Sequence, residues 1–342
     1  MRKASKIPIQ KIADMAGVSI ATVSRVMNHK TSVKEDTKQK VLKILEENNL
    51  NPSSVLLTDQ SSRTILLCVA ELSNPSTPRI ISGIQNAAYQ NNYRVFILQS
   101  KKTYLTFEDY KDVLQHHSFA GIIFIATISE PEMLKTLTRS CPVVMCTEYF
   151  NIKGISFVSI DDKSAAKKAV NYLVSCGCKR IALMNSILQH QYARHREQGY
   201  NEALKAASLK RNEDWINHIS EINYNLAFSY GTSLLSLPNR PDGIFAVSDV
   251  YAVGALHAAK ELGLRVPEDV SIIGFDNIPL SSMVDPPLTT IDQPVSQIGY
   301  QSCELLIEKI NNPLMTPKNI FFNTELIVRQ STGQPKQNNH FG

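Results

Sequence analysis

The stretch from Ala13 to Asn28, ADMAGVSIATVSRVMN, decides the fold of the amino-terminal segment. Apolar and small residues repeat at helical spacing at positions 9, 12, 13 and 16. Gly17 can adopt the positive φ that ends a helix, and the Ser19 hydroxyl can cap the next one. The buried stripe of this second short helix is formed by Val23, Val26 and Met27. The sequence therefore predicts two short helices joined by a tight turn.

A third apolar stripe, Val41, Leu42, Ile44 and Leu45, predicts a supporting helix from about residue 37 to 49. Three such helices make a helix-turn-helix, whose second helix fits the major groove of DNA. Arg25 can donate two hydrogen bonds to guanine, whereas Ile20 and Ala21 offer apolar contact to thymine methyl groups. The side chains suited to phosphate contacts are Ser19, Thr22, Ser24 and Asn28.

Positive charge is concentrated in the same segment. Residues 1–50 hold ten Lys or Arg against five Asp or Glu, and the rest of the chain holds equal numbers of both. A basic head on a neutral body is the distribution expected where the partner is DNA. A solvated basic tail is the alternative that composition alone allows. The length of 342 residues predicts two or three domains.

The sequence lacks the signals that mark several other classes of protein. No run of 18 uncharged apolar residues occurs, and no apolar stretch of a signal peptide follows the first residues, so we expect a cytoplasmic protein without membrane contact. The six cysteines form no Cys-x-x-Cys units and the eight histidines show no ligand spacing. We expect reduced core thiols and neither metal nor cofactor. Motifs of hydrolases and of phosphate-binding loops are absent, so no enzyme is predicted.

The rest of the chain alternates apolar runs with amphipathic stretches, which predicts an α/β core. Strands are expected at residues 64–69, 94–98, 121–125, 143–146, 156–160, 180–184, 243–247 and 270–274. The alternation favours two doubly wound parallel sheets, covered by helices on both faces. Two sheets imply two lobes with a cleft between them, and ligands of such sheets bind at the carboxyl ends of the strands.

Polar residues stand where several of these strands end. They are Asn74, Glu148, Asp249 and Asp276, and Arg196 lies near the start of a helix. Carboxylates and an arginine around a cavity suit a ligand with several hydroxyl groups, because a carboxylate accepts from hydroxyls and an arginine donates to them. The alternative role of such residues is helix capping, to which Asp249 is best suited.

The segment PIQKIADMAGVSIATVSRVMNHKTSVKEDTKQKVLKILEENNLNP, residues 8–52, resembles the DNA-binding domain of the LacI family of bacterial repressors. Its signature is A-x-x-A-G-V-S-x-x-T-V-S-R-V-x-N. The resemblance continues through PDGIFAVSDVYAVGALHAAKELGLRVPEDVSIIGFDNIPL, residues 241–280, and extends over nearly the whole chain. Within the family, GFDNIPLSSMVDPPLTTIDQP is most similar to the cytidine repressor branch.

This resemblance implies a core like the periplasmic binding proteins, in which the chain crosses between the lobes three times. We place the crossings near residues 161–164, 289–293 and 323–326. By similarity, Arg196 and Asp276 match the pair that clamps the effector. Asp249 belongs to the polar pair at its strand end, and Gln293 matches the hinge glutamine.

Two departures from the family pattern stand out. Asn74-Pro75-Ser76-Thr77 replaces Asn-Pro-Phe-Phe, so an aromatic surface toward the ligand is missing there. In the linker, Leu56 and Leu57 stand where relatives have Ala-Arg, and Asp59 stands at the position of the leucine that wedges into DNA. We expect Leu56 or Leu57 to insert into the DNA in place of that leucine. The alternative is that this segment is a plain linker.

The sequence thus predicts a helix-turn-helix domain at 1–50, a hinge at 51–62, a core at 63–333 and a tail at 334–342. The amino lobe would span about 63–161 and 293–323, and the carboxyl lobe about 164–290 and 326–333. The expected function is a transcriptional repressor that binds a palindromic operator as a homodimer, or as a higher oligomer, under control of a nucleoside, ribose or another sugar. The alternatives are a catabolite-control-type regulator with a protein corepressor and a cytosolic solute-binding or sensor protein.

Overall fold

The computed structural model describes residues 9–19, 22–23, 26, 33–47, 63–100, 106–125, 128, 132–138, 141–150, 152 and 154–335. Several residues with a predicted role in DNA binding lie outside this set, and they are Ile20, Ala21, Ser24, Arg25, Asn28, Leu56 and Leu57. Ser19 and Thr22 lie within it.

The amino-terminal helices are α1 (Ile9–Ala16) and α3 (Glu35–Glu47), which begins two residues earlier than the sequence pattern predicts. Their small shared core is formed by Ile12, Ala13, Ala16, Val23, Val26, Val41 and Leu45. Gly17 has a φ of +66° and ends α1. The Ser19 Oγ atom accepts a hydrogen bond of 3.2 Å from the backbone N–H of Thr22, so the predicted cap is present.

The strands in the described part of the chain form two sheets of six. The first has the order β11-β5-β4-β3-β1-β2 and consists of β1 (Thr64–Val69), β2 (Arg94–Gln99), β3 (Gly121–Ile125), β4 (Val143–Cys146), β5 (Ser156–Ile160) and β11 (Asn319–Phe322). The second has the order β12-β10-β9-β8-β6-β7 and consists of β6 (Ile181–Ser186), β7 (Ile216–Ile219), β8 (Gly243–Ala246), β9 (Ser271–Asp276), β10 (Thr289–Asp292) and β12 (Glu325–Ile327). The pairing is parallel except between β10 and β12.

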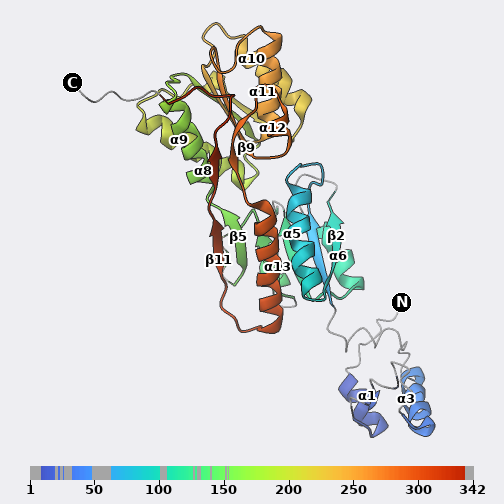
Figure 1. Cartoon of the computed structure of the whole chain (residues 1–342). Helices are drawn as coiled ribbons and strands as arrows, with labels where there is room; N and C mark the ends of the chain where they lie inside the picture. The colour runs from blue at the N-terminus through green and yellow to red at the C-terminus, as the bar shows by residue number, and fades with distance from the viewer. Residues whose placement is uncertain are drawn as a thin grey trace.

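Helices cover both faces of the first sheet, and together they form the amino lobe (Figure 1). These helices are α5 (Thr77–Gln90), α6 (Phe107–His116), α7 (Glu132–Leu137) and α13 (Val295–Asn311). Side chains of β1 alternate between the faces, since Ile65 and Leu67 pack in the cluster that contains α5 and α13, whereas Leu66 and Cys68 pack with α6 and α7. The predicted parallel sheet with helices on both faces is therefore confirmed for this lobe.

The second sheet and its helices form the carboxyl lobe (Figure 1). Its elements are α8 (Asp162–Ser175), α9 (Gln191–Ala206), α10 (Tyr224–Leu235), α11 (Asp249–Glu261), α12 (Leu280–Met283) and a 3-10 turn (Glu213–Trp215). Helices pack in pairs, α8 with α9 and α10 with α11. Gly199 permits the first pair to approach, because a Cβ there would lie 2.2 Å from the carbonyl oxygen of Lys163.

The chain passes between the two lobes at three places. It leaves the first sheet after β5 and enters α8, returns between β10 and α13, and passes back between β11 and β12. These segments lie side by side at the junction of the lobes (Figure 1). Each passage is short, so the lobes are joined by three neighbouring connecting segments. Together these segments can act as a hinge.

All six cysteines are free thiols. Burial raises the pKa of Cys146 to about 12 and that of Cys141 to about 11, which makes both thiols poor nucleophiles. In the described part of the chain, no helix has both the length and the apolar character needed to cross a bilayer.

Candidate functional site

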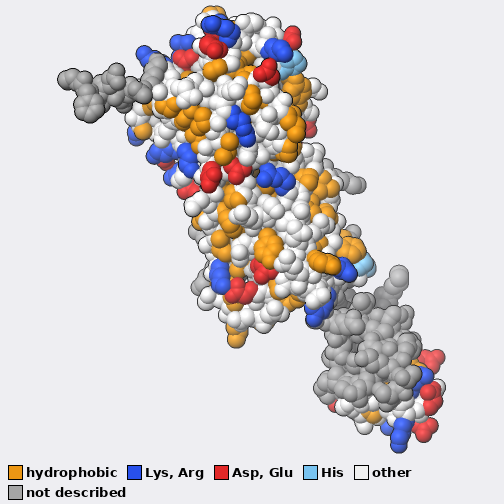
Figure 2. Space-filling view, viewed as in Figure 1, with side chains coloured by type: hydrophobic (Ala, Val, Ile, Leu, Met, Phe, Trp, Pro, Cys, Tyr) orange, Lys and Arg blue, Asp and Glu red, His pale blue; other side chains and the backbone are white. Residues whose placement is uncertain are grey.

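A cavity lies between the two lobes, at the carboxyl ends of both sheets. Residues at or just after the ends of β1, β4 and β5 line it from the amino lobe, and residues at or just after the ends of β8 and β9 line it from the carboxyl lobe. The space-filling view shows acidic and basic side chains close together at the middle of the core (Figure 2). This is the position in which open α/β sheets bind ligands.

The structure brings five of the predicted effector residues to this cavity. Asn74, Glu148, Arg196, Asp276 and Gln293 all line it. Glu148, Arg196, Asp276 and Gln293 are buried, between 6% and 8% exposed. A buried charged or amide group needs a partner, and Arg196, Asp276 and Gln293 find theirs within the protein.

Arg196 projects from the first turns of α9 and is held on several sides. Its Nε and Nη2 atoms lie 2.8 and 2.7 Å from Oδ1 of Asp162, and Nη1 donates to the carbonyl oxygen of Val247 at 2.7 Å. The guanidinium carbon lies 3.5 Å from the ring centroid of Phe275 and 4.9 Å from that of Tyr192. Such contacts fix the guanidinium plane, so Arg196 presents its donors in one orientation.

Asp276 ends β9 with a φ of 109°, in the left-handed region that an aspartate rarely occupies. Its Oδ1 atom accepts a hydrogen bond of 2.6 Å from Nε2 of Gln293, which lies between β10 and α13. Burial raises the pKa of Asp276 to about 6, although Arg196 opposes the shift. The bond links the end of β9 in the carboxyl lobe to the segment at which the chain passes between the lobes.

Asp249 was expected to bind the effector, but the structure places its side chain outside the cavity. It is fully buried at the start of α11 and is absent from the cavity lining. Its Oδ1 accepts from the hydroxyl of Thr290 at 2.6 Å, and its Oδ2 accepts from the backbone N–H of Ile278 at 2.8 Å. The cap of α11 is Ser248, whose hydroxyl accepts from Val250 N–H. Asp249 thus tethers β10 and the loop after β9 rather than facing the cavity.

Glu148 follows β4 and lies near a histidine from the other lobe. The Nδ1 atom of His190 is 3.9 Å from Oε1 of Glu148. Burial lowers the pKa of His190 to about 4, so this ring is neutral near pH 7 and does not balance the carboxylate charge. The preceding residue, Thr147, has a φ of 71°, which is strained for a β-branched side chain.

The cavity also contains residues that sequence reasoning did not identify. They are Glu71, Ser76, Asp162, His190 and Tyr192. Glu71 and Asp162 each follow a strand by two residues, so the same signal that indicated Glu148 could have found them. His190 and Tyr192 enter from the turn before α9, and nothing in the local sequence marks the direction of that turn.

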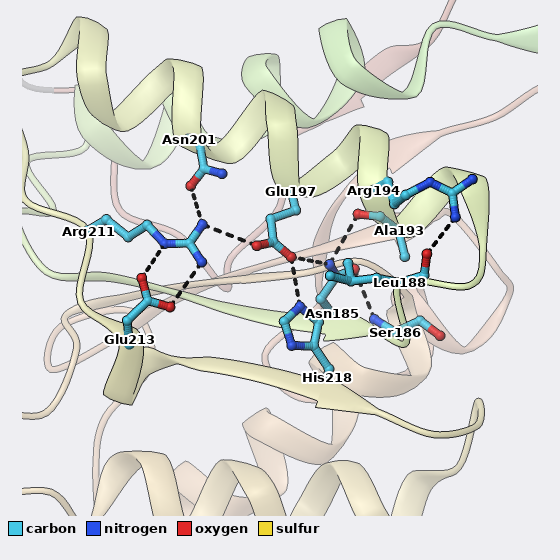
Figure 3. Close-up of polar contacts among 10 residues, drawn as sticks. All are labelled: Asn185, Ser186, Leu188, Ala193, Arg194, Glu197, Asn201, Arg211, Glu213 and His218. Carbon is cyan, nitrogen blue, oxygen red and sulfur yellow. Dashed lines mark hydrogen bonds and ion pairs between the residues drawn. The ribbon is translucent and has the colours of Figure 1, made fainter.

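A polar network holds α9 on the side away from the cavity. Glu197, the residue after Arg196, contacts three partners, with distances of 2.7 Å to His218 Nε2, 3.1 Å to Arg211 Nη1 and 3.1 Å to Asn185 Nδ2 (Figure 3). Hydrogen bonds to Glu197 lower its pKa despite partial burial. These contacts join α9 to β6 and β7, and they thereby support the helix that carries Arg196.

Comparison with known proteins gives matches over both parts of the chain. Residues 8–53 match the model of the lacI family of bacterial regulatory proteins, and residues 170–332 match that of the periplasmic binding protein-like domain. The HTH-type transcriptional repressor CytR of Escherichia coli K12 is 34% identical over 339 residues, which cover 95% of this chain and 96% of the relative. The repressor PurR of Vibrio vulnificus is 30% identical over 327 residues, 94% and 98% of the two chains.

Solved structures show the same architecture. An uncharacterized protein from Actinobacillus succinogenes superposes with a TM-score of 0.73 at 34% identity, over 79% of this chain and 99% of its own. The transcriptional regulator CelR in complex with cellobiose superposes with a TM-score of 0.72 at 24% identity, over 95% and 100% of the two chains, and shows the fold alone.

A helix-turn-helix head followed by a two-lobed core with a polar cavity between its lobes defines a DNA-binding regulator with an effector-binding domain. The chain belongs to the lacI family of bacterial regulatory proteins, whose relatives here are transcriptional repressors. The predicted family and fold class are thereby confirmed.

Proposed function

We propose that this protein represses transcription by binding a palindromic operator as a homodimer, and that a small metabolite in the interlobe cavity changes its affinity for the operator. The observation that carries the proposal is the cavity itself. Both lobes supply buried polar side chains to it, in a chain that also holds a helix-turn-helix. A ligand that contacts both lobes alters their relative position, which is the means by which effector binding reaches the DNA-binding heads.

The roles of individual residues follow from this arrangement. In the cavity, Arg196, Asp276 and Gln293 form the clamp, and Asn74 and Glu148 complete it from the amino lobe. In the head, Arg25 reads guanine and Ile20 and Ala21 contact thymine methyl groups. Phosphate contacts come from Ser19, Thr22, Ser24 and Asn28, and the minor-groove wedge from Leu56 or Leu57. We keep the helix-turn-helix domain at 1–50, the hinge at 51–62, the core at 63–333 and the tail at 334–342, and we extend the carboxyl lobe to begin at Asp162 and to include β10 up to Asp292.

A nucleoside, ribose or another small sugar fits the polar cavity residues as effector. The names of relatives point the same way, since they include ribose operon repressors. Sugars and nucleosides present several hydroxyl groups, which carboxylates and an arginine bind in pairs. No cofactor and no catalysis are invoked, and a cytoplasmic location is proposed because the operator lies there.

Exposed apolar side chains support the homodimer. Tyr89 on α5 is 74% exposed, Phe96 on β2 is 62% exposed and Met283 on α12 is 76% exposed. β2 is an edge strand of its sheet, and an uncovered edge is a ready surface for association. Sedimentation should give about twice the chain mass of 38.2 kDa, and Phe96→Glu should return the monomer. Leu314→Glu, at a site 94% exposed on the loop after α13, is the matched control.

A protein corepressor of the catabolite-control type is the second candidate for the regulating partner, and a cytosolic solute sensor is the third. The buried cavity residues favour the small molecule, because a protein ligand would contact the outer surface of the core rather than side chains that are at most 8% exposed.

The test is selection of genomic fragments by the full-length chain at physiological ionic strength. Binding above the level of random duplex is expected, at a site with twofold symmetry. Arg25→Ala should reduce binding to the selected fragment to the weak, salt-sensitive level of random DNA. The control is Lys43→Ala on α3, whose side chain is 77% exposed. Retention of no fragment above random duplex would contradict the proposal.

A further inference from the structure

Two hydrogen bonds run directly from one lobe to the other. The backbone N–H of Tyr149, which follows β4 of the amino lobe, donates to Oε1 of Gln191 at 2.9 Å, and Gln191 is the first residue of α9 in the carboxyl lobe. Nη1 of Arg79, on α5 of the amino lobe, donates to the carbonyl oxygen of Asn277 at 3.3 Å, and Asn277 follows β9. We call these two contacts the interlobe clasp.

The clasp lies at the rim of the interlobe cavity. None of its four residues belongs to the cavity lining, yet three of them come directly after residues that do. These neighbouring pairs are Glu148 and Tyr149, His190 and Gln191, and Asp276 and Asn277. The clasp therefore joins the lobes through groups other than those that the cavity offers to a ligand.

The two contacts are separated from each other across both sheets. In the amino lobe, Tyr149 follows β4 and Arg79 lies on the helix after β1, and β3 stands between these strands. In the carboxyl lobe, Gln191 opens the helix after β6 and Asn277 follows β9, and β8 stands between these strands. One contact would let the lobes rotate about it, whereas two separated contacts oppose both opening and twisting of the lobes.

Each contact pairs a backbone group of one lobe with a long side chain of the other. The backbone group of Asn277 is held in place, because its side chain accepts from Nη2 of Arg329 at 2.8 Å and donates to Oδ1 of Asp292 at 2.8 Å. The side chains of Arg79 and Gln191 are half-buried, so separation of the lobes would give both contacts to water. A hydrogen bond exchanged for water in this way shifts an equilibrium by about two- to tenfold.

We infer that Arg79 and Gln191 set the equilibrium between closed and open lobes through the clasp, without contact to the effector. Because the lobes move as units, loss of either contact exposes the other more often. The consequence for DNA rests on the proposed function. A chain with a weakened clasp has more open lobes before any ligand binds, so its operator affinity changes without effector.

The experiment measures hydrogen exchange of the Tyr149 backbone N–H by nuclear magnetic resonance, in the full-length chain with isotope-labelled tyrosine. The chain has 12 tyrosines, and the signal of Tyr149 is identified by its loss in Tyr149→Phe. Arg79→Ala leaves the contact between Tyr149 and Gln191 intact, yet it should speed exchange at Tyr149 by about two- to tenfold, because this N–H is released when the lobes open. Gln191→Ala removes the acceptor itself and should speed exchange at least as much.

The matched controls are Arg94→Ala on β2 and Gln198→Ala on α9, both at exposed positions. Exchange at Tyr149 should be the same in both controls as in the wild type. Arg79→Lys keeps a donor of similar reach, so its rate should lie between those of the wild type and Arg79→Ala. It also provides the comparison should Arg79→Ala fold poorly in chemical denaturation.

Two results would overturn the inference. Exchange at Tyr149 that is equal in Arg79→Ala and the wild type would show that the two contacts do not open together. Exchange that is equally fast in Arg79→Ala and Arg94→Ala would show a general loosening of the amino lobe instead of a clasp.

Titration of the selected operator separates these outcomes from failure of the proposed function. Without effector, the double variant Arg79→Ala/Gln191→Ala should change the dissociation constant for the operator by at least about fivefold. Faster exchange with an unchanged constant would keep the clasp and contradict its coupling to DNA. Unchanged exchange with selective operator binding would remove the clasp and leave the proposed function standing.

Discussion

The two lobes have the same kind of sheet, but they use the polar residues at their strand ends differently. After β1 and β4 of the amino lobe, Glu71 and Glu148 reach the cavity, and Asp162, at the start of α8 just after β5, lines it as the ion-pair partner of Arg196. In the carboxyl lobe, Asp249 follows β8 and bonds within its own lobe, and Asn185 near the end of β6 donates to the carbonyl oxygen of Ala193. Asp249 and Asn185 of the carboxyl lobe thus bond within that lobe, whereas Glu71 and Glu148 of the amino lobe line the cavity.

Arg196 and Asp276 are the exceptions in the carboxyl lobe. Each faces the cavity and is linked to a segment at which the chain passes between the lobes, Arg196 through Asp162 and Asp276 through Gln293. Under the proposed function, a ligand that contacts either residue would act on the hinge. The position of a polar residue at a strand end therefore does not decide whether it lines the cavity or bonds within its own lobe. Its hydrogen-bond and ion-pair partners decide that.

The largest effect is expected from Arg196→Ala. The change leaves Asp162 buried without its cation, so the free energy of unfolding should fall by about 3–5 kcal/mol, and the response to effector should vanish. Denaturant unfolding and operator titration measure the two effects. Arg194→Ala, on the exposed side of the same helix, is the control. Asp162→Asn in the Arg196→Ala background should recover part of the stability. Equal stability of Arg196→Ala and the control Arg194→Ala would show that the ion pair between Arg196 and Asp162 does not hold the lobe junction.

The next largest effect is on the pH dependence of the free energy of unfolding. This dependence tests whether Asp249 is buried within its own lobe. Burial raises the pKa of Asp249 to about 8 from an ordinary value of 3.8. The folded state thus holds a proton that the unfolded state releases, and the free energy of unfolding falls as pH rises from about 4 to about 8, by at most about 1.4 kcal/mol per pH unit. Asp249→Asn retains an acceptor for Ile278 N–H and should flatten this dependence.

Thermal unfolding between pH 5 and pH 8.5 compares Asp249→Asn with the wild type and with the exposed control Asp214→Asn. The wild type and the control should lose stability with rising pH more steeply than Asp249→Asn. Parallel curves for all three would show that Asp249 contributes nothing to the dependence.

The smallest change in stability is expected from Ser76→Ala. Because the Ser76 hydroxyl has no partner among the described residues, its removal should raise the free energy of unfolding by up to about 1 kcal/mol. Affinity for a hydroxyl-bearing effector should fall at the same time, since a ligand contact is lost. Ser175→Ala on the exposed end of α8 is the control for chemical denaturation. A loss of stability with unchanged affinity would place Ser76 in the fold rather than in the site.

The parts of the fold that the sequence predicts are those with a strong local pattern. The buried apolar runs of β3 and β4 are found at their observed bounds, because parallel strands covered on both faces are almost wholly apolar. The strands that escaped prediction are short or lie at sheet edges, as in β7 and β12. In β10, Thr289 and Thr290 are buried but polar, so their sequence resembles a loop.

From the sequence, the strongest signal for a cavity residue is a polar residue that follows an apolar strand. Glu148 and Asp276 follow apolar runs and reach the cavity, yet Asp249 has the same signal and does not. The difference lies in Thr290 and Ile278, which come from segments about 30 to 40 residues further along the chain. His190 and Tyr192 reach the cavity because the two lobes face each other, and no local pattern records that arrangement.

The central claim is that occupation of the interlobe cavity governs operator binding. The measurement that tests it most directly is the dissociation constant of the full-length chain for its selected operator, with and without a ligand whose binding Arg196→Lys weakens. A saturating ligand should change that constant by about 5- to 150-fold, and the change should diminish in Arg196→Lys. An operator affinity that stays the same while calorimetry shows the cavity ligand fully bound would contradict the account.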